Sequence, residues 1–512
     1  MFPLAGGFRQ QSELGNFMRL AIVGGGAAAV ILVNLVVLRC SENVKEVTVH
    51  EPGPVVGPGR AYQRDLSCAL LNTPTGAAGV GGNGGARRFA QWLDEQGASA
   101  DPAGYQPRAV FGKYLQHCFL QAQRRAAERG TVVRVIHQSV QQVRPCSDQV
   151  VLTTSDGATF AHDLAVLSPG SAEPAAPFGL PAAENLLVDP YPLWRLLPAV
   201  PRTARVLVLG TGLSGVDVAN ALLRHGHTGG ITLASRRGLL PGVRHPDPVH
   251  QPRHATAERF RELQARGRIR TITDVLRFAG SELVARGISP QVGEEFAHPD
   301  RGFTRLARQI GSATAGPPWR EVLIATLQPI VEPAWAGLTG TQQLRFLAHY
   351  HHLFTTFMNP MPLSTAEVLL AAHRHGRLDL LAGIGTVDSD GEGYCARAGG
   401  GTSVRADVVV NALPQPPGAA ALPLLTGLLA RGAAVAHPCG GVRIDPGTGR
   451  VLTAQGAPQQ RLFALGALTR GTHLVTNSLR SLQRQADDIV DSIASASANP
   501  AHRPDARVGA AS

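Results

Sequence analysis

The 512-residue sequence predicts an α/β protein, because a strand, a glycine-rich turn and a helix follow one another in two separate places. The turns read GGGAAA at Gly24–Ala29 and GTGLSG at Gly210–Gly215, each between a β-branched apolar run and a helix-like stretch. One such turn is weak evidence, since glycines also serve ordinary turns, but two in the same context are specific. The sequence therefore predicts two dinucleotide-binding, Rossmann-like domains.

The first turn has the residues of a phosphate-binding loop. After a short buried strand at 20–23, Gly24 and Gly26 let backbone N–H groups approach a pyrophosphate, and Ala29 takes the place of a third glycine. The phosphate would lie at a helix N-terminus, where unpaired N–H groups and the helix dipole favour negative charge. A second strand ends in Glu51, which we expect to bind a pair of ribose hydroxyls. The alternative is an exposed strand-end glutamate without a ligand.

The second turn differs from the first in the residues after its second strand. The strand Ile231–Ala234 is followed by a serine and two arginines rather than by a carboxylate. A guanidinium there can bind a 2′-phosphate through two charge-assisted bonds, which favours NADPH over NADH. The alternative is that these arginines belong to a basic surface. The predicted binding residues are Gly210, Gly212, Gly215, Ser235, Arg236 and Arg237.

The composition is that of an ordinary enzyme, with 44% hydrophobic and 17% charged residues. The net charge is +11, but its arginines are spread along the chain without a basic block, so we expect no nucleic-acid partner. The apolar run Leu20–Leu38 is long enough to span a membrane. Its three glycines weaken a helix by roughly 1 kcal/mol each, so we expect a strand, a turn and a buried helix, and no membrane insertion.

Both ends of the chain are expected to lie outside the folded domains. Residues 1–18 are predicted to be an N-terminal extension without a cleavable signal peptide, because the first 17 residues hold no continuous apolar segment. Residues 494–512 are rich in Ala, Ser and Pro and are predicted to be a disordered tail.

The six cysteines occur singly, at positions 40, 68, 118, 146, 395 and 439. This spacing excludes the redox dithiol that disulfide reductases with two dinucleotide domains need beside their flavin. It is typical of buried thiols in a reducing cytoplasm, where we expect the protein to be located. We also expect no metal site, because no metal-ligand spacing occurs and the cluster at 349–352 is too crowded to converge on an ion.

Further motifs around the two turns carry a resemblance to a known family. The first turn is followed by HEPGP at 50–54, GRAY at 59–62 and LLNTP at 70–74. Later motifs are FGKYL at 111–115, SRRGLLP at 235–241 after the second turn, and LFALG at 462–466. With these motifs the chain resembles, over about residues 19–490, the FAD/NAD(P)-binding oxidoreductases that include bacterial FAD-dependent urate hydroxylase and aspartate N-monooxygenase.

The resemblance implies a discontinuous FAD-binding domain, at 19–200 and 405–493, closed by the strand that ends at 466. An NADPH-binding domain at 201–404 would be inserted into it, with a helical insertion at about 255–376. The two linkers between the domains depart from the family pattern, because they read LSPG at 167–170 and NALP at 411–414.

The resemblance also implies residues near the flavin. The turn after the closing strand would place Thr472, Thr476 and Asn477 near the isoalloxazine ring, with helix capping as an equal alternative. Further cofactor contacts are implied for Arg60, Asn72, Gly170 and Gly466. Arg108 is a candidate to meet a substrate carboxylate, and structural ion pairs are the alternative for the arginines.

The implied activity is that of an NADPH-dependent flavoprotein monooxygenase with O₂ as co-substrate. Reduced FAD would form a C4a-hydroperoxyflavin that hydroxylates a small polar nitrogen-containing metabolite, of amino acid or purine type, without a protein nucleophile. The alternatives are an FAD oxidase or dehydrogenase, or a non-catalytic flavoprotein that serves as a partner subunit. Candidate pocket residues, for which core packing is the alternative, are Trp319, Trp335, His349, His351 and Phe357.

Overall fold

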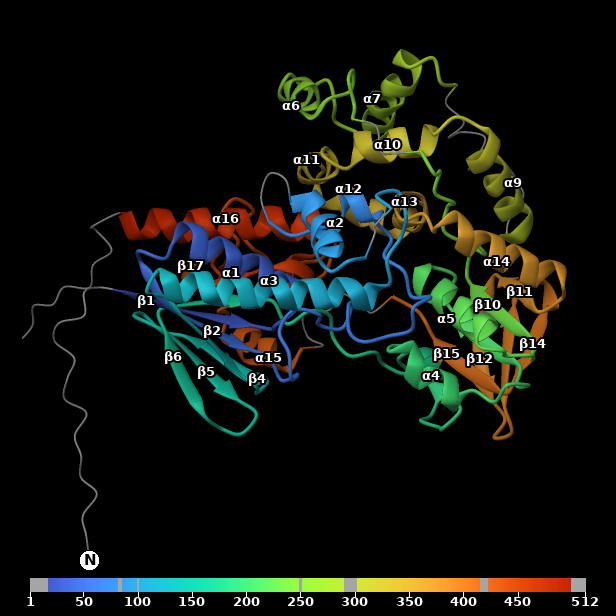
Figure 1. The fold of residues 1–512 in the computed structure, drawn as a ribbon, viewed down its shortest axis with the longest axis horizontal. Coiled ribbons are helices and arrows are strands. Elements are labelled where there is room, and N and C mark those ends of the chain that lie inside the picture. Colours follow the sequence, from blue (N-terminus) through green and yellow to red (C-terminus); the bar gives the residue numbers. More distant parts are fainter. Residues whose placement is uncertain are drawn as a thin grey trace, which may run out of the picture.

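The computed structural model describes residues 17–81, 85–98, 101–247, 251–289, 302–414 and 422–498. Two parallel sheets lie side by side, and a group of helices arches over both of them (Figure 1). Short 3-10 turns lie at Thr75–Ala77, Pro177–Gly179, Gly399–Gly401 and Gly466–Thr469. The two parallel sheets confirm the predicted α/β class with two dinucleotide-binding folds.

The first sheet has the strand order β16-β17-β7-β1-β2-β3 and is parallel except at its β16 edge. Its strands are β1 (Met18–Val23), β2 (Val44–His50), β3 (Val132–Ile136), β7 (Leu164–Leu167), β16 (Arg450–Leu452) and β17 (Pro458–Ala464). Alternate side chains of its central strand enter two different cores: Leu20 and Ile22 pack on one face, and Ala21 and Val23 on the other. A parallel sheet that is covered on both faces explains why these strands read as continuous apolar runs.

Helices cover one face of the first sheet and a small antiparallel sheet covers the other (Figure 1). The covering helices are α1 (Ala27–Arg39), α2 (Gly85–Glu95), α3 (Arg108–Glu128) and α16 (Leu479–Ala498). The opposite face is covered by β4 (Val140–Pro145), β5 (Val150–Thr154), β6 (Thr159–His162) and α15 (Pro423–Ala430). The run Leu20–Leu38 is thus divided into strand, turn and buried helix as predicted, and none of the described helices is long and apolar enough to cross a membrane.

The second sheet is parallel throughout, in the order β11-β10-β9-β15-β8. Its strands are β8 (Leu186–Leu187), β9 (Val206–Leu209), β10 (Ile231–Ser235), β11 (Leu378–Ala382) and β15 (Val408–Asn411). One face packs on α4 (Leu193–Ala199), α5 (Leu213–Arg224) and α14 (Leu363–Arg374). The other packs on the antiparallel sheet β12 (Ile384–Ser389), β13 (Tyr394–Ala398) and β14 (Ser403–Ala406).

The described residues between β10 and β11 are mostly helical and form the arch of Figure 1. Before α14 it contains α6 (Ala257–Ala265), α7 (Ile272–Ala285), α9 (Gly302–Ala315), α10 (Trp319–Leu327), α11 (Val331–Ala336), α12 (Gly340–His349) and α13 (His351–Met358). Much of this segment has a core of its own, in which Phe260, Leu283 and Ile330 are fully buried.

Two details of the predicted organisation need correction. β8 and β15 lie in the second sheet, so the bounds predicted for the FAD-binding domain, 19–200 and 405–493, do not follow the division between the two sheets. The sequence misplaced both because a short apolar strand carries no sign of which sheet it joins. Helix α16 also continues to Ala498, past the predicted start of the tail at 494, while residues 1–16 and 499–512 lie outside the described residues.

Candidate functional site

The first glycine turn connects β1 to α1 and leaves a helix N-terminus open. Gly24 has φ +101°, and a Cβ there would lie 2.3 Å from the Ser168 carbonyl oxygen, so a side chain at this position would displace the backbone of the turn. Gly26 is the N-cap of α1 and has no side chain to cap it, and the first turn of α1 holds no acidic residue. The first N–H groups of α1 therefore have no side-chain acceptor, which is the condition for a phosphate to bind there.

Glu51 follows β2 and lies directly beside this turn. Its carboxylate accepts one hydrogen bond from the Gly25 N–H, at 2.7 Å, and another from the Gly53 N–H, at 2.8 Å. These bonds hold the Glu51 carboxylate next to the open N-terminus of α1. The loop at 57–59 crosses this turn, because the Gly57 N–H donates to the Gly25 carbonyl at 2.7 Å.

The second turn repeats the geometry of the first. Gly210 has φ +115°, and a Cβ there would lie 2.6 Å from the Ala412 carbonyl oxygen. A Cβ on Gly215 would lie 2.1 Å from the Gly210 carbonyl oxygen, so the third glycine allows the helix to pack on the turn. Gly212 is the N-cap of α5 and again has no capping side chain. Both turns therefore fit a bound phosphate by the same criterion.

Two exposed arginines follow β10, and one of them is hydrogen-bonded to the helical segment. The Arg237 guanidinium lies 2.6 Å from Nε2 of His352 on α13. Burial, and next the charge of Arg237, lowers the pKa of His352 to about 4, so this imidazole is neutral and can accept the hydrogen bond. Arg236 is exposed, and none of the ion pairs between described residues includes it. Ser235 Oγ accepts from the Gly238 N–H at 3.0 Å and thus shapes the turn that carries both arginines.

Arg108 has a carboxylate partner within the protein itself. At the start of α3 it forms an ion pair with Asp217 of α5, and it stacks on the Tyr191 ring at 4.9 Å. The Tyr191 hydroxyl donates to Asp217 at 2.8 Å. Burial raises the pKa of Asp217, and Arg108 opposes that rise. Arg108, a candidate to bind a substrate carboxylate, is therefore engaged in an ion pair that joins α3 to α5. A structural ion pair was the alternative for this arginine.

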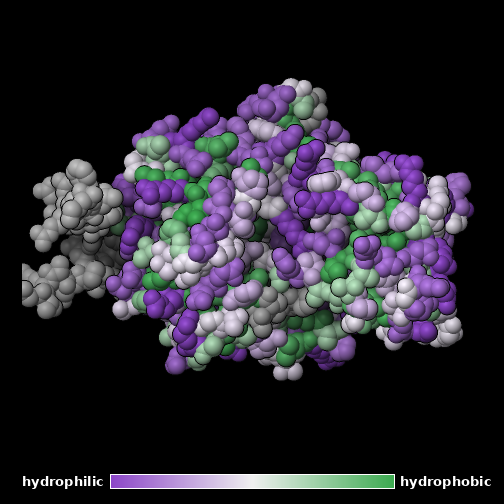
Figure 2. Space-filling model, turned by 90° about the horizontal axis from the view of Figure 1, so that it is seen from below, coloured by the Kyte–Doolittle hydropathy of each residue, from purple (hydrophilic) through white to green (hydrophobic). Residues whose placement is uncertain are grey.

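We call the first sheet with its covering elements the first-sheet half, and the second sheet with its covering elements the second-sheet half. The candidate residues Arg60 and Asn72 contact residues outside the first-sheet half. Arg60 forms a 2.7 Å ion pair with Asp189, and both side chains are partly exposed. Asn72 is exposed, and its carbonyl accepts from Arg244 at 3.3 Å. Gly170 is exposed in the linker after β7, with φ +82°. Seen from below, the surface is hollowed near its centre, between the first-sheet half on the left and the second-sheet half on the right (Figure 2).

The turn after β17 is closely packed. Gly466 is buried at φ +76°, and its N–H donates to Gln485 Oε1 at 2.9 Å. Thr476 is 9% exposed, Thr472 is partly buried, and Asn477 is exposed. In the arch, Trp319, Trp335 and Phe357 are core residues, which supports the packing alternative for these aromatic side chains.

Sequence reasoning missed three contacts that join the arch or α5 to the first-sheet half. They are Asp217 with Arg108, Arg244 with the Asn72 carbonyl, and Glu332 with the turn after β17. No local pattern marks these residues, because each contact joins positions more than 100 residues apart.

Among the described residues no group of three metal-ligating side chains converges. A cavity of about 520 Å³ in the arch, lined by Arg253, His254 and Arg286, contains no residue of either glycine turn.

Comparison with known proteins agrees with this geometry. Residues 21–172 match the family model described as FAD-NAD(P)-binding. No curated protein matches the sequence. Among solved structures, ornithine N-hydroxylase from Kutzneria sp. 744, described with reduced FAD, NADP⁺ and L-ornithine, is similar with a TM-score of 0.60 and 15% identity, covering 93% of this chain and 99% of that one.

Two further structures have similar coverage. Ornithine hydroxylase from Pseudomonas aeruginosa gives a TM-score of 0.58 at 14% identity, covering 94% of this chain and 99% of that one. A mutant flavin monooxygenase from Stenotrophomonas maltophilia gives 0.50 at 14% identity, with the same coverage. At these identities the likeness establishes the fold: the chain has the two-dinucleotide-domain fold of FAD- and NAD(P)-dependent oxidoreductases.

Proposed function

Because residues 21–172 match the FAD-NAD(P)-binding family and the whole chain has a two-domain flavoprotein fold, we propose that it is an NADPH-dependent flavin monooxygenase. The observation that carries the proposal is the pair of glycine turns, each at a helix N-terminus without a capping side chain. A non-catalytic descendant would have little reason to keep both. Two of the similar structures are amino-acid hydroxylases, which favours a small amino acid over a purine as substrate.

Each turn has a separate role in this proposal. The N-terminus of α1 would hold the FAD pyrophosphate and Glu51 its ribose, while the N-terminus of α5 and Arg236 would hold NADPH. When bound, FAD would supply the redox chemistry, namely hydride acceptance from NADPH and activation of O₂, by which one oxygen atom reaches the substrate and the other leaves as water. The protein would orient both nucleotides and exclude water from the reduced flavin.

We place the division between the two proposed domains at the linkers rather than at 200 and 404. The chain leaves the first sheet after β7, joins the second sheet at β8, and leaves it again after β15. The proposed FAD-binding domain then comprises about residues 19–170 and 422–498, and the proposed NADPH-binding domain about residues 186–414, including the helical arch.

The test is rapid mixing of the purified protein with NADPH and then with O₂, alone and with ornithine, aspartate or urate in turn. Bleaching of the flavin, followed by a transient absorbance band that decays faster when a substrate is present, would support monooxygenation. Bleaching and reoxidation without a transient would favour an oxidase or dehydrogenase. Bound FAD that NADPH does not bleach would favour the non-catalytic alternative.

The choice of NADPH is tested by the two neighbouring arginines. Arg236→Ala should raise KM for NADPH by about tenfold and leave KM for NADH unchanged, since it removes one charge-assisted contact with the 2′-phosphate. Arg237→Ala is the matched control, because its guanidinium is already bonded to His352. Equal effects of Arg236→Ala on both nucleotides would contradict the assignment.

A further inference from the structure

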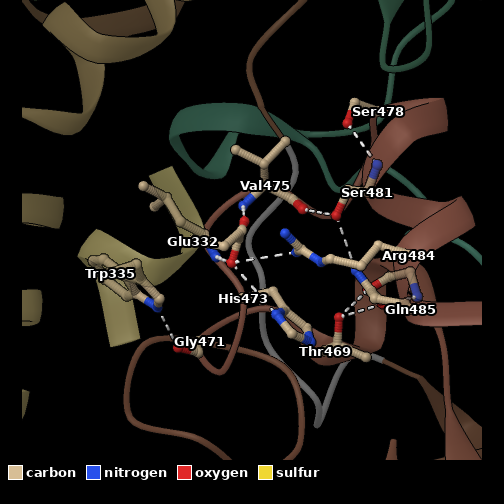
Figure 3. A network of polar contacts seen from close by, with 12 residues as sticks. Glu332, Trp335, Thr469, Gly471, His473, Val475, Ser478, Ser481, Arg484 and Gln485 are labelled. Carbon is tan, nitrogen blue, oxygen red and sulfur yellow. Dashed lines mark hydrogen bonds and ion pairs between the residues drawn. The ribbon is translucent and has the colours of Figure 1, made fainter. Parts of the chain in front are cut away.

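One helix of the arch reaches across to the first-sheet half. Glu332 of α11 contacts residues 470–477, which we call the closing turn because they connect the end of β17 to α16. Its carboxylate accepts the N–H of Leu474 at 3.2 Å and the N–H of Val475 at 2.8 Å (Figure 3). His473 Nδ1 lies 3.3 Å from the same carboxylate. The Glu332 side chain is 9% exposed, so these contacts are largely shielded from water.

Trp335 holds the same turn three residues further along α11. Its Nε1 donates to the Gly471 carbonyl at 2.7 Å, and its ring, which is 2% exposed, packs with Phe346 and Cys439 (Figure 3). Residues three apart lie on one face of a helix, so Glu332 and Trp335 contact the turn together. α11 therefore holds the closing turn at both Gly471 and Val475.

The first-sheet half holds the turn in a different way. On α16, Ser481 donates to the Val475 carbonyl, and Gln485 Oε1 accepts from the Gly466 N–H at 2.9 Å and from Thr469 Oγ1 at 3.0 Å. α16 thus fixes the 3-10 turn at Gly466–Thr469, which precedes the closing turn, and the Val475 carbonyl within the closing turn. The N–H groups of residues 474 and 475 are bonded to a residue 142 or 143 positions away in the chain.

We propose that Glu332 and Trp335 are positioning residues for the flavin, which act by fixing the orientation of the closing turn. Val475 directly precedes Thr476, the residue expected near the isoalloxazine ring, so the direction of the 474 and 475 N–H groups determines how Thr476 is presented. The arch that is inserted between β10 and β11 would then complete the flavin site from outside the FAD-binding half. This inference rests on the proposed function.

The decisive substitution is Glu332→Gln. A carboxylate offers acceptors to both N–H groups, but an amide offers one acceptor and turns an NH₂ donor toward the other N–H. We expect hydrogen–deuterium exchange of the peptide that contains residues 474 and 475 to become about tenfold faster, because a part-buried donor loses its acceptor. Glu367→Gln is the matched control, since Glu367 is exposed on α14 of the same inserted segment.

The same variants are then compared as FAD-loaded protein. Glu332→Gln should shift the visible spectrum of the bound flavin and lower its rate of reduction at saturating NADPH, while KM for NADPH stays near that of the wild type. Trp335→Phe should do the same more weakly, because it keeps the ring and removes one hydrogen bond. It also serves as the test if Glu332→Gln does not fold. Glu367→Gln should match the wild type in every measurement.

Three outcomes can be told apart. Faster exchange with an unchanged flavin spectrum and reduction rate would reduce Glu332 to a structural contact and overturn the inference. Unchanged exchange would overturn it at the first step. A wild-type protein that holds no flavin, or whose flavin NADPH does not bleach, would instead overturn the proposed function on which the inference depends.

Discussion

Two buried histidines predict that the first-sheet half loses stability in mild acid. His50, the last residue of β2, and His162, the last of β6, are 1% and 4% exposed, and their ring centroids lie 6.0 Å apart. Neither His50 nitrogen has a hydrogen-bond partner among the described residues, and Phe160 covers the His50 ring at 5.4 Å. Burial lowers the pKa of both side chains from 6.5 to about 4, with His162 adding to the effect on His50 and Arg19 to that on His162.

The sign and size of the effect follow from these values. The folded-state pKa lies below the unfolded one, so the unfolded chain binds protons first as the pH falls below 6.5, and stability falls with it. Between about pH 7.5 and about pH 5, each histidine should cost about 2 kcal/mol, or about 4 kcal/mol together. The loss should level off below about pH 4, where the folded protein also becomes protonated.

The assay is the urea midpoint of unfolding as a function of pH. Replacing both rings by leucine should remove about 4 kcal/mol of acid sensitivity relative to the wild type, because leucine does not titrate. Other lowered histidines, such as His351, contribute equally to both proteins and cancel in the comparison. An exposed control, His375→Gln, should keep the wild-type dependence. If the double variant and the wild type lose stability in parallel from pH 7.5 to pH 5, the reasoning is refuted.

Because His50 precedes Glu51, we also expect bound FAD to be released over this range.

Other substitutions test the two halves and their junction. Asp217→Asn should lower the free energy of unfolding by about 2 to 3 kcal/mol, since Arg108 would be left largely buried without a counter-charge. The double variant Arg108→Met with Asp217→Leu should recover most of this loss. Both are measured by urea unfolding. Gly210→Ala should weaken NADPH binding by tenfold or more with unchanged FAD content, because a non-glycine residue at φ +115° costs about 1 to 2 kcal/mol before the clash with Ala412 is relieved. Gly24→Ala should lower FAD content instead, as measured by the ratio of flavin to protein absorbance.

The strand–turn–helix units could be predicted because their determinants are local. A glycine that needs a positive φ, an apolar strand and a helix without an N-capping side chain all occur within about twenty residues, as at Gly24 and Gly210. The two parallel sheets and the helical arch follow from the order of such segments. The resemblance to flavin-dependent oxidoreductases agrees with the family match and with the fold.

The contacts between the halves could not be predicted from the sequence. In the sequence Arg108 is a candidate to bind an anion. Only the folded chain places Asp217 beside it, because α3 packs on the first sheet and α5 on the second. Glu332 lies in a helix of six residues with no motif around it, and its partners are backbone N–H groups, which every residue of the chain except proline carries. Pairing of a side chain with distant backbone leaves no trace in composition or spacing.

The altered linkers bear on the choice between a catalytic and a non-catalytic protein. At each turn the first glycine abuts a linker carbonyl, that of Ser168 for Gly24 and that of Ala412 for Gly210. The linker backbone is fixed in the same way at both places, because the Ser168 N–H donates to the Val23 carbonyl and the Ala412 N–H to the Leu209 carbonyl, each at 2.8 Å. These contacts use backbone atoms, so they tolerate the departures from the family pattern as long as the glycines remain. The side chains at 168 and 412 therefore give no reason to prefer the non-catalytic alternative. Whether NADPH bleaches the bound flavin decides between a catalytic and a non-catalytic protein.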